Sequence, residues 1–256
     1  MKNEIVFCIP SYKRGDKPLL TLKHIPNALV FVDTSEAERY RETNKGAEII
    51  AVPSGVQGNL CRIRNYILDY CFNKEAYAVV IMDDDINCFY KVGENDKHSL
   101  KFNKIAGDEF MFVVQTIANI ADNVGAKMFG LNPNSSDGLS FRETQPFTFI
   151  NYIGGPFQGF LNNTIRYDER LSLKEDYDMT LQHLLKYRRV VRCEFVRYLA
   201  KMHENKGGCA EMRDVDVENE QFNLLQRKWG KNIVRRDKSS KGHDINPLLK
   251  IPLKGI

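Results

Sequence analysis

Two short acidic stretches contain the residues best suited to chemistry. Asp83, Asp84 and Asp85 directly follow a run of apolar residues. Three adjacent carboxylates repel one another, and Mg²⁺ or Mn²⁺ offsets that repulsion because these hard cations prefer oxygen ligands. Asp83 and Asp85, two residues apart, can turn toward one ion whose open positions accept a diphosphate. The sequence therefore predicts a Mg²⁺ or Mn²⁺ site at residues 83–85.

Two other interpretations of these acids stay open. Four residues fall at ligand positions of an EF-hand-like calcium loop: Asp83, Asp85, Asn87 and Glu94. However, Cys88 stands where that loop requires glycine, and the preceding apolar run is typical of a strand rather than an entering helix. The second interpretation is a solvated acidic loop that binds nothing.

The second acidic stretch is Glu175-Asp176-Tyr177-Asp178, which opens a segment with helical spacing. Acids in the first turn of a helix suit the helix dipole. A carboxylate here, distant in sequence from the metal ligands, can take a proton from an attacking hydroxyl as a general base. The spacing does not decide which of Glu175, Asp176 and Asp178 points inward.

Apolar periodicity predicts the elements that position these residues. In the first half we expect strands at 5–9, 28–32, 48–52 and 76–82, and helices at 35–44, 60–72 and 108–124. This alternation predicts an α/β fold with an open, mostly parallel, Rossmann-like sheet. Ligands of such sheets lie outside the carboxyl ends of the strands.

The second half has looser spacing and predicts mixed strands. We expect strands at 128–131, 147–153 and 190–199, a glycine-rich turn at 154–159, and helices at 175–187 and 217–229. The polar residues after 230 indicate a tail. The domain prediction is one domain over residues 1–230 and a basic C-terminal extension over residues 231–256.

Several polar residues follow the ends of the early strands. Pro10, Ser11, Tyr12 and Arg14 follow the first strand, and Asp33 ends the second. Gly58 and Asn59 open the helix that carries Arg62, Arg64 and Asn65. Backbone amides at a helix N-terminus favour anionic ligands, and a carboxylate such as Asp33 can accept hydrogen bonds from a base or a ribose. Turn chemistry explains each residue separately, but their joint placement favours a nucleotide site.

Composition and charge limit the class of protein. The 256 residues are 43% hydrophobic and 27% charged, as in an ordinary globular protein. The net charge of +4 is uneven, because residues 186–256 hold 17 Lys and Arg against 9 Asp and Glu. Such an excess attracts polyanions, including nucleic acid, or forms a solvated face.

The chain is expected to be soluble and cytoplasmic. No apolar segment approaches the ~20 residues of a membrane span, and residues 10–14 interrupt the apolar run where a signal peptide would lie. The six cysteines form no CxxC pair and suit reduced thiols. The sequence does not indicate an oligomeric state.

The motifs together resemble a known class of enzymes. Pro-Ser-Tyr at 10–12, an acid after the second strand and the Asp-rich stop at 83–85 resemble the GT-A glycosyltransferases, whose acidic stop is the DxD motif. Arg-x-Arg-Asn at 62–65, Glu-Asp-Tyr-Asp at 175–178 and a later Met-His with Gly-Gly are most similar to the phage TET-associated glycosyltransferases, relatives of the base J glucosyltransferase. The resemblance spans about residues 5–230.

This resemblance implies roles for individual residues. The nucleotide-sugar site would include Pro10, Ser11, Tyr12, Arg14, Asp33, Gly58, Asn59, Arg62, Asn65, Asp83 and Asp84. The metal would be held by Asp83, Asp85 and His203. The acceptor and sugar pocket would include Gly154, Gly155, Phe157, Gln158 and Glu175. Asp176 would be the catalytic base of an inverting displacement, with Asp178 as the runner-up.

The same resemblance implies a UDP-sugar donor and, as acceptor, hydroxymethylated pyrimidines in phage DNA. A base inside duplex DNA must be flipped out to react, and one of four aromatic residues would stack on it: Tyr152, Phe157, Tyr177 or Trp229. Basic residues such as Arg188, Arg227 and Lys231 would contact phosphates.

Four alternatives are considered. A GT-A enzyme acting on glycan, lipid or protein would share the donor chemistry. A non-catalytic nucleic-acid-binding protein would show no metal-dependent hydrolysis of a nucleotide sugar. Sugar nucleotidyltransferases carry an early glycine-rich phosphate loop that this chain lacks, and the absence of GxxxxGK[ST] excludes a P-loop enzyme.

Overall fold

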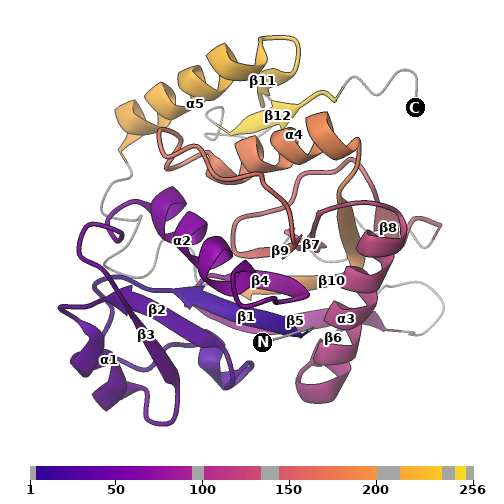
Figure 1. Cartoon of the computed structure of the whole chain (residues 1–256). Coiled ribbons are helices and arrows are strands. Elements are labelled where there is room, and N and C mark those ends of the chain that lie inside the picture. The colour runs from indigo at the N-terminus through magenta and orange to yellow at the C-terminus, as the bar shows by residue number, and fades with distance from the viewer. Residues whose placement is uncertain (1–3, 94–100, 134–143, 201–213, 238–245, 252–256) are drawn as a thin grey trace.

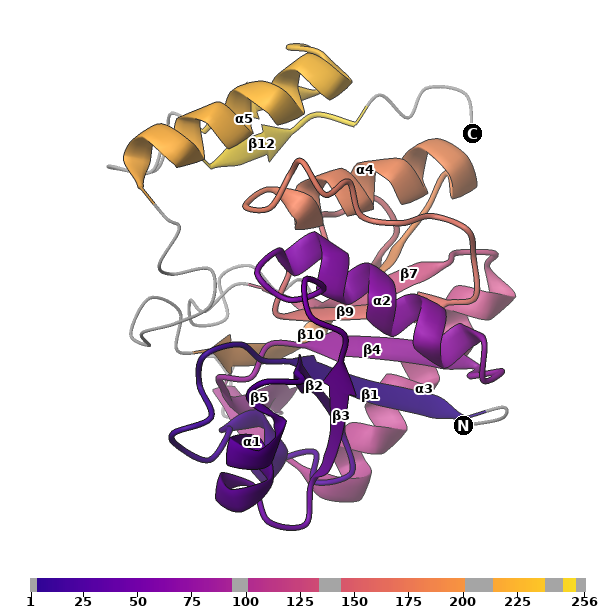
Figure 2. The same cartoon turned by 60° about the vertical axis from the view of Figure 1, so that its left-hand side comes forward.

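The computed structural model describes residues 4–93, 101–133, 144–200, 214–237 and 246–251. A ten-stranded sheet lies at its centre, in the order β3-β2-β1-β4-β9-β7-β10-β5-β6, with β8 paired to β10. Helices cover both faces of this sheet (Figures 1 and 2). The α/β prediction is therefore confirmed.

One half of the sheet is parallel, as the sequence predicts. It consists of β1 (Ile5–Pro10), β2 (Leu29–Asp33), β3 (Glu48–Val52) and β4 (Ala78–Met82). Parallel neighbours need crossover connections, here provided by η1 (Thr21–Lys23), α1 (Ala37–Thr43) and α2 (Leu60–Phe72). All five residues of β4 are buried, as expected of a central strand.

The other half of the sheet is mixed. It contains β5 (Ile86–Gly93), β6 (Lys101–Ile105), β7 (Met128–Asn132), β8 (Phe147–Thr148), β9 (Phe157–Leu161) and β10 (Val191–Ala200). β9 runs antiparallel to β4 and β7, whereas β7 and β10 are parallel. The parallel half followed by a mixed half matches the expected GT-A arrangement.

Three strand predictions in this half were wrong or missing. The sequence did not predict β5 and β6, and the strand expected at 147–153 is limited to β8. The predicted glycine-rich turn extends only to Pro156, because Phe157, Gln158 and Gly159 belong to β9. Gly159 is a packing glycine: a Cβ at this position would lie 2.1 Å from the ring of Phe129.

The two faces of the sheet form separate hydrophobic layers. One face packs against α1 and α3 (Gly107–Asn123), with Phe89, Phe110 and Phe157 near its centre. The other face packs against α2 and α4 (Glu175–Tyr187), through residues such as Ile67 and Met179. Figure 2 shows α2 and α4 on one side of the sheet and α3 on the other.

A third layer lies outside α4. It consists of α5 (Val215–Trp229) and a two-stranded sheet of β11 (Val234–Arg236) and β12 (Pro247–Leu249) (Figure 1). Phe222, Leu225 and Val234 pack with Leu171 and Leu181 in one cluster. The residues after 230 are therefore not simply the polar tail expected, because β11 and β12 supply apolar contacts.

Candidate active site

The candidate site lies at the sheet edge where β1, β4 and β10 end. Ser11 follows β1, Asp83 follows β4, and Tyr198 lies near the end of β10. The start of β9 reaches the same edge, because the Asp83 backbone N–H donates to the Pro156 carbonyl at 3.1 Å. Ligands of open α/β sheets bind at such an edge.

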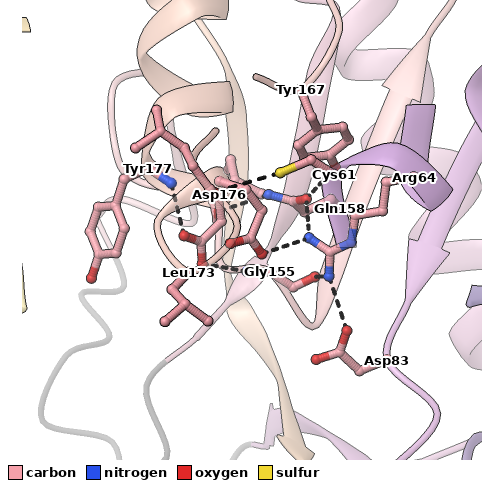
Figure 3. A network of polar contacts seen from close by, with 12 residues as sticks. Cys61, Arg64, Asp83, Gly155, Gln158, Tyr167, Leu173, Asp176 and Tyr177 are labelled. Carbon is pink, nitrogen blue, oxygen red and sulfur yellow. Dashed lines mark hydrogen bonds and ion pairs between the residues drawn. The ribbon is translucent and has the colours of Figure 1, made fainter. Parts of the chain in front are cut away.

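Arg64 of α2 connects the two acidic stretches across this edge (Figure 3). Its side chain is 1% exposed. Nη2 donates to Asp83 Oδ1 at 3.0 Å and to the Gly155 carbonyl at 3.1 Å. Nη1 donates to Glu175 Oε1 at 3.1 Å and to Gln158 Oε1 at 3.2 Å. One buried guanidinium thus holds the end of β4, the start of β9 and the start of α4 together.

The sequence analysis missed the role of Arg64, although a signal was present. Arg64 precedes Ile67, Leu68 and Cys71 by three, four and seven residues, so it shares their buried helical face. Charged residues are almost never fully buried unless they are paired. A guanidinium on the apolar face of a helix therefore indicates buried acids opposite.

The three acids after β4 occupy different environments. Asp84 has a side chain 5% exposed and accepts hydrogen bonds from Ser11 Oγ at 2.5 Å and from Arg14 Nη1. Burial raises the pKa of Asp84, and the Arg14 charge opposes that rise. Asp83 is 32% exposed, and Asp85 is 13% exposed and lies 3.6 Å from Arg14. Asp84 is therefore buried against Ser11 and Arg14, while Asp83 is the most exposed of the three acids.

Asp83 and Asp85 fit the protein part of a Mg²⁺ or Mn²⁺ site. Mg²⁺ keeps several waters and commonly uses one or two carboxylates together with substrate phosphates. In the described part of the chain no group of three or more His, Cys, Asp or Glu side chains could hold an ion by itself. His203, the third predicted ligand, and Glu94 of the calcium-loop alternative lie outside the described residues.

Asp176 lies in the first turn of α4 and accepts three hydrogen bonds. Oδ2 accepts from the Tyr152 hydroxyl and from the Gly155 backbone N–H at 3.1 Å. Oδ1 accepts from the Tyr177 backbone N–H at 2.9 Å. The residue is half-buried, so its carboxylate is held in place and still reaches the surface of the site.

The neighbouring acids of α4 are buried. Glu175 is bound by Arg64, and burial, reinforced by the charge of Asp176, raises the pKa of Glu175 to about 8. Asp178 accepts from Lys228 Nζ at 2.9 Å and from Trp229 Nε1 at 2.7 Å. Asp178, the runner-up base, thus anchors α5 to α4. Of the three predicted candidates, Asp176 is the one that is not fully buried.

The predicted pocket residues divide into two groups. A Cβ on Gly154 would lie 2.4 Å from Tyr198 Oη, and one on Gly155 would lie 3.2 Å from Asp176 Oδ2, so both glycines border the site. Phe157 lies elsewhere: it is fully buried in the layer under α3. Gln158 is also fully buried and supports Arg64 from below.

The predicted nucleotide-binding residues of the first loop lie beside Asp84. Pro10 is the last residue of β1, and Ser11 Oγ contacts Asp84 and the Tyr40 hydroxyl, the latter at 2.9 Å. Tyr12 follows and is half-buried. Asp33, at the end of β2, accepts hydrogen bonds from the backbone and hydroxyl of Ser35 within its own turn.

The predicted residues around the start of α2 make contacts within the protein. Gly58 has φ +87 and precedes Asn59, whose side chain caps α2 by accepting from the N–H groups of Cys61 and Arg62. Arg62 extends to Glu169 at 3.1 Å, and Asn65 donates to the Tyr167 carbonyl at 3.0 Å. These contacts fix the 162–174 segment, and the structure does not bring Arg62 or Asn65 to Asp83.

Many C-terminal basic residues have internal partners. Arg189 donates to the Val124 carbonyl at 2.8 Å, Arg192 pairs with Glu194 at 2.7 Å, and Lys228 pairs with Asp178. Arg197 and Arg236 lie over the rings of Phe102 and Phe222. The exposed basic residues of this region include Arg188, Arg227, Lys231 and Arg235. Lys238 and Lys241 lie outside the described residues.

Known structures of similar shape include two bacterial proteins. Staphylococcus aureus TarS 1–349 aligns with a TM-score of 0.47 and 13% identity over 88% of this chain, which spans 65% of that chain. Glucosyl-3-phosphoglycerate synthase from Mycobacterium tuberculosis, in complex with Mn²⁺, UDP-glucose and phosphoglyceric acid, aligns with a TM-score of 0.48 and 11% identity over 92% of this chain and 84% of that one.

No curated protein matches this chain. Residues 5–208 match the family described as TET-Associated Glycosyltransferase. This match includes the acids after β4, the whole of α4 and every residue described above as bordering the site. The family-level expectation from the sequence motifs is confirmed, and the chain belongs to the TET-associated glycosyltransferase family.

Proposed function

We propose that this protein transfers a sugar from a UDP-sugar to an acceptor hydroxyl, with Asp176 as the general base. The observation that carries the proposal is the placement of Asp176. Its carboxylate is held by Tyr152, Gly155 and Tyr177, is half-buried, and is linked through Gly155 and Arg64 to Asp83. A base and a donor-side carboxylate thus share one sheet edge, as a transfer reaction requires.

The proposed reaction is a direct displacement. The acceptor oxygen forms a bond to the anomeric carbon as its proton passes to Asp176. The bond from that carbon to the diphosphate oxygen breaks, and its electron pair leaves with the nucleoside diphosphate. Attack opposite the leaving group inverts the anomeric configuration. General-base assistance of this kind contributes about 10²–10⁴-fold.

Metal dependence is part of the proposal. Asp83 and Asp85 would hold Mg²⁺ or Mn²⁺, with His203 as a further predicted ligand. Bound there, the ion would neutralise charge on the departing diphosphate. Arg14 and Arg64 already balance part of the acidic charge around residues 83–85. They would therefore orient the carboxylates rather than replace the ion.

The proposed acceptor is a hydroxymethylated pyrimidine in DNA, such as 5-hydroxymethylcytosine, as in a phage genome. Family membership supports this choice. The exposed Arg188, Arg227, Lys231 and Arg235 are available for phosphate contacts, which would weaken with salt. A glycan, lipid or protein acceptor is the competing possibility. The five buried cysteines of the described residues form no disulfide, which favours action in a reducing cytoplasm.

A mass-spectrometric donor and acceptor screen tests the proposal. Purified protein is incubated with Mn²⁺, a panel of UDP-sugars, and DNA that contains 5-hydroxymethylcytosine, 5-hydroxymethyluracil or normal bases alone. The expected result is a hexose-sized mass gain on one modified base, abolished by a chelator. Asp176→Asn should lower the rate by about 10²–10⁴-fold.

Asp122→Asn is the matched control, since Asp122 is an exposed acid on α3. This helix covers the face of the sheet opposite to that covered by α4. It should retain the rate of the unmodified protein. Release of UDP without a DNA product would move the acceptor to glycan, lipid or protein. Full activity of Asp176→Asn would remove Asp176 as the base, and no turnover with any donor would favour a non-catalytic binding protein.

A further inference from the structure

Among the residues that the structure describes, Tyr152 makes the single side-chain hydrogen bond to the Asp176 carboxylate. It lies between β8 and β9, and its hydroxyl donates to Asp176 Oδ2. The two other donors, from Gly155 and Tyr177, are backbone N–H groups. Those amides move only with the main chain. The Tyr152 hydroxyl is therefore the donor through which the orientation of the carboxylate can be changed without altering the backbone.

Tyr152 is itself fixed on two sides. Its ring stacks on Tyr177, with ring centroids 4.2 Å apart and planes 15° from parallel. Its carbonyl accepts from Arg192 Nη1 at 2.9 Å, and Arg192 is held by Glu194 at 2.7 Å. Thr148 also donates to Glu194, at 2.7 Å. Polar contacts from β10 thus hold the main chain of Tyr152, and stacking on Tyr177 holds its ring.

The chemistry of this contact is one-directional. Burial, and then the charge of Asp176, raise the pKa of Tyr152 well above its ordinary value. The phenol therefore keeps its proton and acts as the donor in the hydrogen bond to Asp176. Charged and titratable groups on neighbouring elements also face Asp176: Arg64 on α2, Tyr167 before α4, Glu175 and Tyr177 on α4, and Tyr198 on β10.

The two carboxylate oxygens of Asp176 therefore differ. Oδ2 accepts two hydrogen bonds, from Tyr152 and Gly155, while Oδ1 accepts one, from Tyr177, in the described part of the chain. A carboxylate oxygen has two lone-pair sites. Oδ1 thus has capacity for one more hydrogen bond, and an acceptor hydroxyl is the group that a general base needs there.

We propose that Tyr152 is a positioning residue: by binding Oδ2, it directs the free lone pair of Asp176 Oδ1 toward the acceptor hydroxyl. The inference rests on the proposed function of Asp176 and specifies how that base is oriented. The transferred proton goes from the acceptor to Oδ1, and Tyr152 keeps its own proton throughout. Tyr152 would therefore orient the catalytic carboxylate of Asp176. It would not stack on a flipped pyrimidine, the role considered from the sequence.

Tyr152→Phe tests the inference because it keeps the ring on Tyr177 and removes only the hydroxyl. With UDP-glucose and 5-hydroxymethylcytosine DNA, we expect kcat to fall about 10- to 100-fold, the range for losing a hydrogen bond to a charged group. KM for UDP-glucose should stay within about twofold, because the donor lies at the Asp83 side. Tyr187→Phe, the same change at the last residue of α4, is the matched control and should leave kcat unchanged.

A second readout is independent of turnover. In high-resolution crystal structures of the full chain, Asp176 should keep one rotamer in the unmodified protein and adopt a second one in Tyr152→Phe. An unchanged Asp176 rotamer in Tyr152→Phe overturns the inference even if no acceptor is found. An unchanged kcat also overturns it, and so does a fall in kcat that matches the loss of folded protein. If Asp176→Asn retains full activity, the proposed function fails instead, so the two failures are distinguishable.

Discussion

Each of the two acidic stretches combines a more exposed acid with a buried neighbour, but different parts of the protein bind the buried acids. After β4, the buried member is Asp84, and it is bound by Ser11 and Arg14 from the adjacent loop of the same sheet edge. In α4, Glu175 and Asp178 are both buried. Arg64 of α2 binds Glu175, whereas Lys228 and Trp229 from a separate layer bind Asp178. In each stretch a neighbouring acid, Asp83 or Asp176, stays accessible.

This difference shows that adjacency of acids in sequence does not imply a shared function. A carboxylate next to a reactive one can be a structural anchor. The element that carries its basic partner, such as Arg14 or Lys228, decides which part of the fold it stabilises. The first stretch is held by Ser11 and Arg14 after β1 and by Arg64 of α2. The second depends on the C-terminal layer, so the proposed base is coupled to α5 while the proposed metal ligands are not.

The largest expected effect separates the stretches by pH. Because its pKa is raised to about 8 by burial and Asp176, Glu175 binds a proton more tightly in the folded state than in the unfolded state. The contribution of Glu175 to the free energy of unfolding is therefore fully present below pH ~4.5 and is lost as the pH rises to about 8. This loss is on the order of several kcal/mol. Glu175→Gln should flatten the fall in stability over this window, measured by urea unfolding at pH 5.5, 7 and 8.5. Equal slopes in both proteins would contradict the assignment.

The next effect tests the anchor in α4. Asp178→Asn leaves the Trp229 indole and Lys228 without their buried carboxylate, although Lys228 keeps Asp168. We expect a loss on the order of 3 kcal/mol, which lowers Tm by roughly 10 °C in a chain of this size. Asp216→Asn, an exposed acid on α5, is the control for calorimetry. An unchanged Tm in Asp178→Asn would show that Asp178 does not anchor α5 to α4.

A smaller effect is expected after β4. Asp84→Asn removes the charge that Arg14 binds, but Arg14 keeps Asp85 3.6 Å away. We expect a loss of about 2 kcal/mol in stability and an affinity for UDP, measured by calorimetry, within about twofold of the unmodified protein. A large loss of UDP affinity with unchanged stability would return Asp84 to the nucleotide site that the sequence suggested.

The smallest effect concerns Ser11. Ser11→Ala removes one hydrogen bond to Asp84 and one to Tyr40. The expected loss is about 1–2 kcal/mol, read from the denaturant midpoint. Ser35→Ala, which alters an exposed turn, is the matched control and should cost less. A Ser35 effect as large as that of Ser11 would mean that the first loop is not a special anchor of Asp84.

Much of the fold was predictable because its early strands are continuous apolar runs between polar turns. β1 to β4 and helices α2, α3 and α4 were placed to within a few residues. β5 and β6 were missed because Asp83 to Glu94 was interpreted for its ligands, and β5 has several polar residues on its less buried side. Gly159 suggested a turn, since a sequence does not reveal that Phe129 fills the space of its absent side chain.

The site was predictable in its positions more than in its contacts. Asp83 and Asp176 were selected by residue type and resemblance, and the structure brings their surroundings together through Arg64. The distinction between Asp176 and Asp178 depends on Trp229, which is distant in sequence and reaches Asp178 only after the chain folds back. No helix of the described residues is apolar and long enough to cross a bilayer.

The contact of Trp229 with Asp178 also has a consequence for how the protein is made. Chains are synthesised from the N-terminus, so α4 is made before Lys228 and Trp229 are added. Until then Asp178 has no indole or ammonium partner from α5. The nascent chain would therefore complete the support of its α4 acids among the last steps of folding, and translation that stops before α5 would release a chain without that support.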